Sequence, residues 1–212
     1  MSEIKIEKIP LGFIGANCYF VTLDGETAII DPGLDNSKLA VLLEEYKGRV
    51  KYILLTHRHA DHLMGLAMAK KATDAKVAIH AADQEGCFDS SVSLSRSIFR
   101  REIEAVYPET VLHGGEKLPF GNGEITVIHT PGHTLGSVCF IIGNRLFSGD
   151  TVFLEEIGRC DLESANFDEM LDSLRKLSAL DGDFSIYPGH GENTTLQHER
   201  ERNPYFIKAA QI

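Results

Sequence analysis

The sequence is poor in basic residues and contains no long apolar run. It has 21 Lys and Arg against 31 Asp and Glu, which gives a formal net charge of −10. Clustered positive charge, on which binding to nucleic-acid phosphates depends, is therefore missing. No apolar stretch approaches the roughly 20 residues that a membrane-spanning helix needs. We therefore expect neither nucleic acid nor a membrane as a partner.

Cysteine is also scarce, and its spacing excludes the usual thiolate metal sites. The four cysteines are far apart and form no C-x-x-C pair. A zinc–thiolate centre is therefore not indicated, and reduced thiols are expected. The N-terminal stretch "MSEIKIEKIP" lacks the basic segment and apolar block of a secretory signal. Together these features predict a cytoplasmic protein.

Strand and helix patterns alternate along the whole chain, and no low-complexity linker divides its 212 residues. Residues 81–112 are less regular and could border a site. Mixed strands and helices in both halves predict a layered α/β or α+β architecture in one domain over 1–212. Strands are predicted at 4–9, 18–23, 27–31, 50–56, 76–80, 123–130, 137–143, 145–150 and 183–189, and helices at 37–48, 62–72, 166–180 and 194–203.

The stretch "LLTHRHADHLMG" holds the densest chemistry in the sequence. His57, His59, Asp61 and His62 fall within six positions, directly after a predicted buried strand. Histidine is the commonest metal ligand, and carboxylates often complete such sites. Composition alone predicts only about 0.001 occurrences of this pattern, so a solvated polar loop is the weaker interpretation. The spacing offers two pairs of ligands from one turn.

Three further polar residues follow predicted strands and stand beside glycine. His133 lies in "TPGHTLGS", Asp150 in "FSGDT" and His190 in "YPGHGE". Glycine lets the backbone turn sharply enough to bring such side chains inward. Strand ends that deliver histidine and aspartate to one rim of a sheet are typical of an active site.

These motifs, in this order, resemble the metallo-β-lactamase-fold hydrolases. "DPG" at 31–33, "HRHADH" at 57–62, "GH" at 132–133, "GD" at 149–150 and "GH" at 189–190 carry the resemblance over nearly the whole chain. It implies a four-layer αββα sandwich with a metal site at the edge of the two sheets. It further implies two divalent metal ions, which Zn²⁺ suits best and Fe or Mn would also fit. The implied ligands are His57, His59 and His133 for one ion, Asp61, His62 and His190 for the other, and Asp150 between them.

The same resemblance implies a reaction. Two metals can share a hydroxide that attacks an electrophilic carbonyl, with Asp61 orienting the nucleophile or relaying its proton. Asp31, in "IIDPG", would either steady a ligand histidine or be a plain turn residue. We expect the remaining histidines to be structural or surface residues: His80, His113, His129 and His198.

Within the family, "GDTVF", "IGRCDL" and "YPGHGENTTLQHERERNPYF" are most similar to glyoxalase II and its shorter relatives. This predicts hydrolysis of a small-molecule thioester such as a hydroxyacylglutathione, without the separate C-terminal substrate domain of the long enzymes. The family's basic-x-aromatic pair falls on Arg159 and Asp161, so only the basic member is present. Arg159 would pair with a substrate carboxylate or anchor its own loop.

Other interpretations remain open. "GRCDL" also resembles a loop of the persulfide dioxygenases, which would hold one iron on His57, His133 and Asp150. Lactonases and phosphodiesterases of the same fold share all the ligands. A metal-binding module without turnover is a further alternative, although it would not need all seven ligands. The oligomeric state is not predicted.

Overall fold

The computed structural model describes residues 3–10 and 16–211, and its strands form two six-stranded sheets. The first sheet has the order β1-β2-β3-β4-β5-β6 and uses the first half of the chain. Its strands β1 and β2 are antiparallel to their neighbours, whereas β3, β4, β5 and β6 run parallel. The strands are β1 (Lys5–Pro10), β2 (Asn17–Leu23), β3 (Glu26–Ile30), β4 (Val50–Leu54), β5 (Lys76–His80) and β6 (Thr110–Leu112).

The second sheet has the order β12-β11-β10-β9-β8-β7. It is antiparallel except for the parallel pair β10 and β11. Its strands are β7 (Lys117–Phe120), β8 (Gly123–His129), β9 (Val138–Ile142), β10 (Arg145–Gly149), β11 (Ser185–Pro188) and β12 (Thr194–Thr195).

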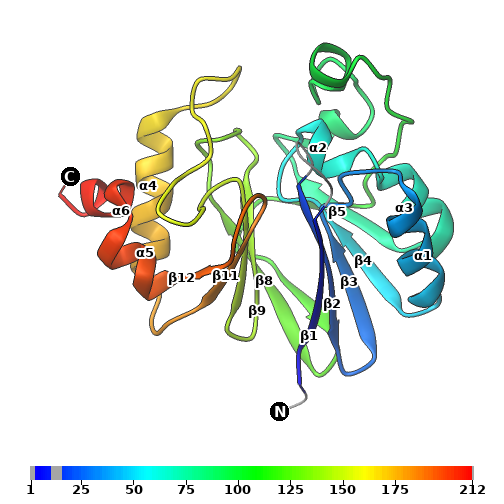
Figure 1. The fold of residues 1–212 in the computed structure, drawn as a ribbon, viewed down its shortest axis with the longest axis horizontal. Helices are drawn as coiled ribbons and strands as arrows, with labels where there is room; N and C mark the ends of the chain where they lie inside the picture. The colour runs from blue at the N-terminus through cyan, green and yellow to red at the C-terminus, as the bar shows by residue number, and fades with distance from the viewer. Residues whose placement is uncertain (1–2, 11–15, 212) are drawn as a thin grey trace.

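The two sheets face each other, and helices cover the outer face of each (Figure 1). A core that includes Tyr19, Phe120 and Phe140 lies between the sheets. A second core packs the first sheet against α1 (Ser37–Glu45) and α3 (Leu66–Thr73). A third packs the second sheet against α4 (Phe167–Ser178), α5 (Leu196–Arg202) and α6 (Pro204–Ala209). This confirms the predicted four-layer αββα sandwich, because an apolar face on each layer has a partner.

The structure divides the helix predicted over 62–72. α2 (Ala60–Leu63) ends before Gly65, and α3 begins at Leu66. A Cβ atom on Gly65 would lie 2.7 Å from the carbonyl oxygens of Pro32 and Leu34, so the backbones meet too closely for any side chain. The apolar periodicity continues across this break, which is why the pattern did not reveal it.

The other predicted elements are largely confirmed, with shorter bounds. Asn166 caps α4 by accepting hydrogen bonds from the backbone N–H groups of Asp168 and Glu169, as the sequence "NFDEM" suggests. The predicted helix over 194–203 is replaced at its start by the short strand β12. Sequence patterns did not predict β6, β7 or α6. Among the described residues, no helix combines the length and apolarity needed to cross a bilayer.

The irregular stretch 81–112 contains two short helical turns and β6. η1 (Gln84–Cys87) is a 3₁₀ turn, and η2 (Ser95–Phe99) is a turn of π-helix. The backbone N–H of Ala60, at the start of α2, donates to the carbonyl of Ser93 at 2.9 Å. This bond holds the η2 segment beside the "HRHADH" turn.

Candidate metal centre

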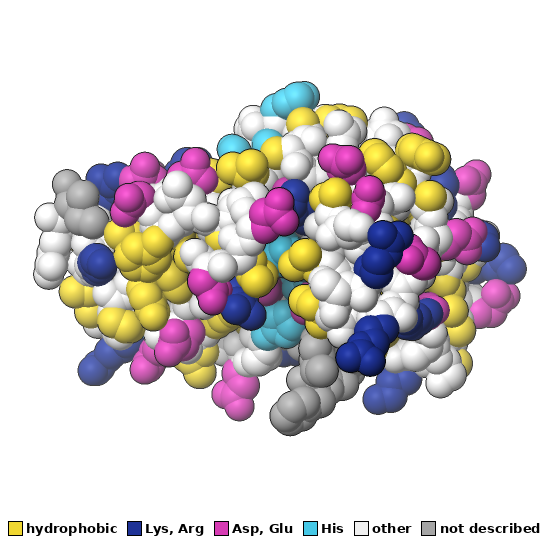
Figure 2. Space-filling model, turned by 90° about the horizontal axis from the view of Figure 1, so that it is seen from above, with side chains coloured by type: hydrophobic (Ala, Val, Ile, Leu, Met, Phe, Trp, Pro, Cys, Tyr) yellow, Lys and Arg dark blue, Asp and Glu magenta, His cyan; other side chains and the backbone are white. Residues whose placement is uncertain are grey.

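The predicted ligand residues meet at one edge of the two sheets. His57, His59, Asp61 and His62 come from the turn after β4 and from α2. The other three follow strands of the second sheet: His133 after β8, Asp150 after β10 and His190 after β11. Figure 2 shows histidine side chains in a hollow near the middle of this face, bordered by hydrophobic side chains. The strand ends therefore bring together residues up to 133 positions apart in the sequence.

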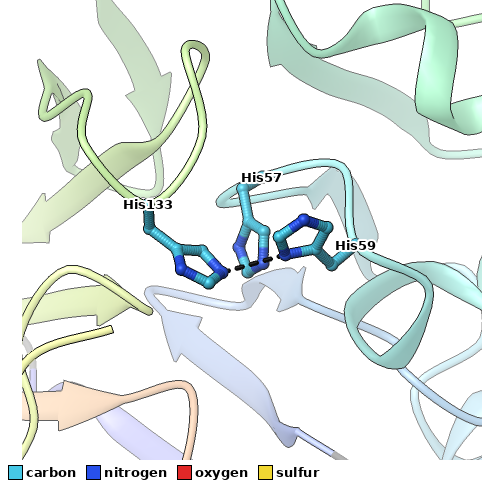
Figure 3. Close-up of side chains that lie close together, drawn as sticks. All are labelled: His57, His59 and His133. Atoms are coloured by element: carbon cyan, nitrogen blue, oxygen red, sulfur yellow. Dashed lines mark hydrogen bonds between the residues drawn. The ribbon is translucent and has the colours of Figure 1, made fainter. Parts of the chain in front are cut away.

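Three buried imidazoles form one group, which we call the histidine triad: His57, His59 and His133. Their rings point toward one another from two different sheets (Figure 3). His59 Nδ1 lies 2.9 Å from His133 Nε2. The ring centroids of His57 lie 4.8 Å from those of both His59 and His133. One potential ligand atom from each residue lies within 4.8 Å of the others.

A second group, which we call the mixed triad, contains Asp61, His62 and His190. His190 Nε2 lies 3.2 Å from Asp61 Oδ2, and His62 Nε2 lies 3.9 Å from the same oxygen. The side chains of Asp61 and His190 are 21% and 34% exposed, whereas His62 is fully buried. This group therefore faces the solvent more than the histidine triad does.

Asp150 lies between the two triads. Its Oδ1 is 3.2 Å from His62 Nε2, and its Oδ2 is 3.5 Å from His133 Nε2 and 3.6 Å from His190 Nε2. Gly189 makes this approach sterically feasible, since a Cβ atom there would lie 2.2 Å from Asp150 Oδ1. One carboxylate thus reaches both groups of nitrogen atoms.

Asp31 is a buried hydrogen-bonding residue, which answers the choice left open by its sequence. The Thr56 backbone N–H donates to its Oδ1 at 2.8 Å, and the Thr56 hydroxyl donates to its Oδ2 at 2.7 Å. His62 Nδ1 donates to Oδ2 at 2.9 Å. With Nδ1 held there, the Nε2 atom of His62 points toward Asp150 and becomes a ligand atom once its proton leaves.

The same logic orients two members of the histidine triad. The Thr56 hydroxyl donates its hydrogen bond to Asp31. Its oxygen therefore accepts a hydrogen bond from His57 Nδ1 at 3.1 Å. His133 Nδ1 donates to the backbone carbonyl of Arg159 at 2.8 Å. In both rings the Nε2 atom is left unprotonated and available as a ligand.

Asp83 is a supporting residue that the sequence reasoning missed. It is fully buried and follows β5. Its carboxylate accepts hydrogen bonds from the Arg58 and Gly136 backbone N–H groups, both at 3.1 Å, and from the Thr134 hydroxyl at 2.6 Å. Burial raises its pKa. Asp83 therefore joins the turn that carries His57 to the turn that carries His133. The available signal was its place just past a strand end.

Burial keeps two imidazoles of the histidine triad, His57 and His59, neutral. Desolvation, followed by the neighbouring histidines, lowers the pKa of His57 well below its usual value. Desolvation, followed by His133, lowers the pKa of His59 to about 3. Neutral imidazole is the form that binds a metal ion, so these two rings need lose no proton to do so.

Carboxylates reverse this effect in the mixed triad. Burial disfavours the charged form of His62, but Asp150, Asp31 and Asp61 outweigh it and raise the pKa of His62. Burial likewise opposes charge on His190, yet the hydrogen bond to Asp61 and the charge of Asp150 raise its pKa. The pKa of Asp61 and that of Asp150 are lowered: burial opposes ionisation of both, but His62 and other nearby histidines favour it.

Unpartnered polar atoms test whether the site suits a metal ion. His57 Nε2, His59 Nε2, His62 Nε2 and Asp150 Oδ1 are buried and have no hydrogen-bond partner. Leaving several such atoms buried in one place is costly unless a cation satisfies them. Nitrogen and carboxylate oxygen atoms without thiolate suit Zn²⁺ and also accommodate iron or manganese. The residues therefore fit a metal centre.

A cleft of about 410 Å³ opens onto the centre. It is lined by His59, Asp61, His133, Asp150 and His190 of the two triads, with Arg159 at its border. The remaining lining is apolar and was not assigned from the sequence: Ala60, Leu94, Ile98, Phe153, Ile157 and Leu162. The expectation that 81–112 shapes the site is confirmed by Leu94 and Ile98.

The predicted substrate residue Arg159 reaches this cleft, but its guanidinium is engaged. Nε and one terminal nitrogen donate to the two carboxylate oxygens of Asp161 at 2.7 and 2.8 Å. Both side chains are exposed. The backbone carbonyl of Arg159, in contrast, holds His133, which is a role that the sequence did not suggest.

The remaining four histidines lie outside both triads, as expected. The His80 and His129 rings stack with centroids 4.1 Å apart, and His129 Nε2 bonds to the Leu135 carbonyl at 2.9 Å. His113 lies near His80. His198 Nε2 lies 3.0 Å from a carboxylate oxygen of Glu155.

Comparison with known proteins identifies related sequences over most of the chain. The family model described as the metallo-beta-lactamase superfamily matches residues 11–190. A protein of Streptococcus pyogenes described as a probable metallo-hydrolase is 32% identical over 213 residues, which cover 96% of this chain and 90% of that protein. The hydroxyacylglutathione hydrolase GloC of Haemophilus influenzae is 31% identical over 207 residues, which cover 95% and 98% of the two chains.

Two solved structures are similar over nearly their whole length. The BLEG-1 B3 metallo-beta-lactamase superposes with a TM-score of 0.88 at 32% identity and covers 95% of this chain and 99% of its own. The protein TTHA1623, solved in a di-iron-bound form, gives a TM-score of 0.83 at 33% identity, with 94% and 99% coverage.

Proposed function

Because this chain belongs to the metallo-β-lactamase superfamily, we propose that it is a binuclear metallohydrolase that cleaves thioesters such as hydroxyacylglutathiones. The observation that carries the proposal is the place of Asp150, whose two carboxylate oxygens reach nitrogen atoms of both triads. A single structural ion would need only four closed ligands. Seven converging side chains beside an open cleft leave room for water and substrate.

In this proposal each triad would hold one divalent ion, and the Asp150 carboxylate would be a ligand available to both. When bound, the ions would supply an activated water and positive charge to stabilise the developing oxyanion. Zn²⁺ suits the nitrogen and oxygen ligands best. Iron is the main competitor, because the relative TTHA1623 was solved in a di-iron-bound form.

The protein's own groups have distinct tasks. Asp31, Thr56 and the Arg159 carbonyl hold the Nδ1 protons of His62, His57 and His133 and so keep their Nε2 atoms directed inward. Asp61 faces the cleft and has a lowered pKa. It therefore stays ionised, and its Oδ2 can accept a hydrogen bond from the attacking water and orient it.

The thioester substrate rests on the sequence motifs and on the similarity to GloC. Similarity to BLEG-1, described as a B3 metallo-beta-lactamase, supports β-lactam hydrolysis as a second candidate. Both reactions need the same catalytic groups. In each, a nucleophile attacks a carbonyl carbon and negative charge develops on the carbonyl oxygen. The wall of the cleft, more than the metal ligands, would decide between them.

The first experiment is to purify the protein without oxygen, count its metals and assay lactoylglutathione hydrolysis in the same preparation. Two metals per chain together with thioester turnover are expected. A parallel assay with a β-lactam tests the second candidate. A single tightly held iron, with oxygen uptake on glutathione persulfide and no thioester turnover, would overturn the proposal in favour of a dioxygenase. Turnover restricted to lactones or phosphodiesters would also contradict the thioester substrate.

We propose that the Arg159 guanidinium leaves the Asp161 carboxylate and binds a carboxylate of the substrate in its place. We expect Arg159→Ala to raise KM for a glutathione thioester several-fold while kcat changes little, since the guanidinium binds ground state and transition state alike. The matched control is Arg175→Ala on α4, which removes an exposed arginine away from the cleft. Equal KM values for both variants and the wild type would exclude this role.

A further inference from the structure

The η2 segment places an apolar surface beside the candidate metal centre. Leu94 and Ile98 line the cleft on the side of α2, and Ile98 is 56% exposed. Phe153, Ile157 and Leu162, from the segment after Asp150, also line it. The Phe153 ring lies edge-on to His190 with centroids 5.9 Å apart. Exposed apolar side chains are unremarkable one by one, but a group that borders converging polar ligands is typical of a ligand site.

The backbone of η2 adopts an unusual conformation that has a cost. The residues flanking this single turn of π-helix, Leu94 and Arg100, have left-handed backbone angles, with φ of 64° and 53°. Such conformations are unfavourable for residues other than glycine, and π turns are frequent at functional sites. The hydrogen bond from Ala60 to Ser93 fixes this segment next to His59 and Asp61. The position of the apolar side chains relative to the ligands is therefore set by the fold.

The cleft offers few charged groups for recognition of a substrate. Among the described residues that line the cleft, the acidic side chains are Asp61 and Asp150, which are both proposed metal ligands. The basic side chain is that of Arg159. The guanidinium of Arg159 already has a two-point contact with Asp161. Leu94 and Ile98 carry no group that could pair with a charged or strongly polar substituent. Such a substituent would lose its bound water there and gain no hydrogen bond in return.

We propose that Leu94 and Ile98 form a binding surface for an apolar substituent next to the scissile bond of the substrate. This deepens the proposed function, on which it rests: the preferred substrate carries an aliphatic or aromatic group on one side of its carbonyl. Contact with this group removes the exposed Ile98 side chain from water, so binding strengthens as the group grows until it fills the cleft.

Three ligand series test this inference on the metal-loaded protein. Glutathione thioesters of acetate, butanoate and hexanoate vary the acyl side, and acetyl thioesters of ethanethiol, butanethiol and hexanethiol vary the thiol side. Calorimetric titration with acetate, butanoate and hexanoate measures binding without turnover. We expect kcat/KM in at least one thioester series, and the carboxylate affinity, to rise about two- to four-fold per methylene, the upper value being that of a fully buried CH₂ group.

Variants then assign the effect to η2. Ile98→Ser should flatten the dependence on chain length, whereas Ile98→Leu should preserve it. Ile207→Ser is the matched control, because Ile207 lies on α6 and is also exposed, at 43%. It should behave as the wild type does.

The outcomes separate this inference from the proposed function. Thioester hydrolysis without any dependence on chain length in the three series, or a dependence that survives Ile98→Ser, overturns the inference and leaves the thioester activity standing. Carboxylate affinity that rises with chain length and is lost in Ile98→Ser, in a protein that cleaves no thioester, supports the binding surface and rejects the thioester activity.

Discussion

The histidine triad and the mixed triad share a carboxylate, yet they differ in charge and in access to solvent. His57, His59 and His133 are buried, and the pKa values of His57 and His59 are lowered. In the mixed triad, Asp61 and His190 are partly exposed, and the pKa values of His62 and His190 are raised. The histidine triad is therefore a buried group in which His57 and His59 are neutral. Asp61 and His190 of the mixed triad line the cleft, and the histidines of this triad have raised pKa values.

The difference shows what carboxylates add to a cluster of imidazoles. Burial alone makes an imidazole neutral because a charged ring loses its hydration. His62 is as buried as His57, but Asp31 lies 2.9 Å from one of its ring nitrogens and Asp150 lies 3.2 Å from the other. A charged pair of this kind restores the protonated form. The chemical character of each triad is thus decided by its acidic neighbours.

Removal of the shared carboxylate should have the largest effect, because it breaks both triads at once. Asp150→Asn is expected to lower hydrolysis by three orders of magnitude or more, the scale of losing a residue that acts as part of a unit. Metal analysis should give fewer than two ions per chain. Asp172→Asn, on the exposed side of α4, is the control and should keep full activity and both metals. Two ions and normal turnover in Asp150→Asn would refute the bridging role.

Substitution in the mixed triad alone should separate the two groups. Asp61→Asn is expected to reduce turnover by about 100-fold or more, in the range of a lost proton-transfer or orienting group. One metal should remain, because the histidine triad is untouched. The check is metal content measured beside steady-state kinetics. Full activity in this variant would contradict a role for Asp61 and would favour a mononuclear enzyme.

Asp31 acts through His62 and should have a smaller effect. Asp31→Asn is expected to lower metal affinity or activity about 10- to 100-fold, as for other partners that orient a ligand histidine. Competition with a chelator measures the affinity, and the loss should fall on one of the two ions. Asp35→Asn provides a surface control, because Asp35 is exposed and pairs with Arg101. Equal loss of both ions would mean that Asp31 supports the whole fold.

The smallest expected effect is the number of protons released when a metal binds, which depends directly on the protonation of the two triads. At pH 7 His57 and His59 are already neutral, since their pKa values are lowered. In the metal-free protein His62 and His190 hold a proton more firmly than a free imidazole does, since their pKa values are raised, and any proton on their ligand nitrogens must leave when a metal binds. Titration of zinc into metal-free protein in buffers of different ionisation enthalpy should therefore show about one or two protons released for the mixed triad. His57 and His59 should release almost none. Equal release in both steps would contradict the assigned charges.

The sequence singled out the candidate ligand residues because each of them follows a local pattern. His57, His59, Asp61 and His62 lie in one turn, and His133, Asp150 and His190 each follow an apolar strand beside glycine. The break at Gly65 and the strands β6 and β7 were missed, because they depend on close backbone approach or on pairing with a distant strand. Asp83 was missed for a similar reason, since its three donors come from two segments far from it in the sequence.

By itself the sequence determined the layered α/β class, the residues able to hold a metal and the absence of clustered basic charge. Local hydrophobic periodicity and the types of side chain at strand ends are enough for these conclusions. Only the tertiary structure decided which histidines face each other, that Asp150 lies between the triads, that Asp161 occupies Arg159, and that Leu94 and Ile98 border the cleft. The physical reason is that distances, burial and pKa values depend on residues brought together from both sheets, and no local pattern encodes those contacts.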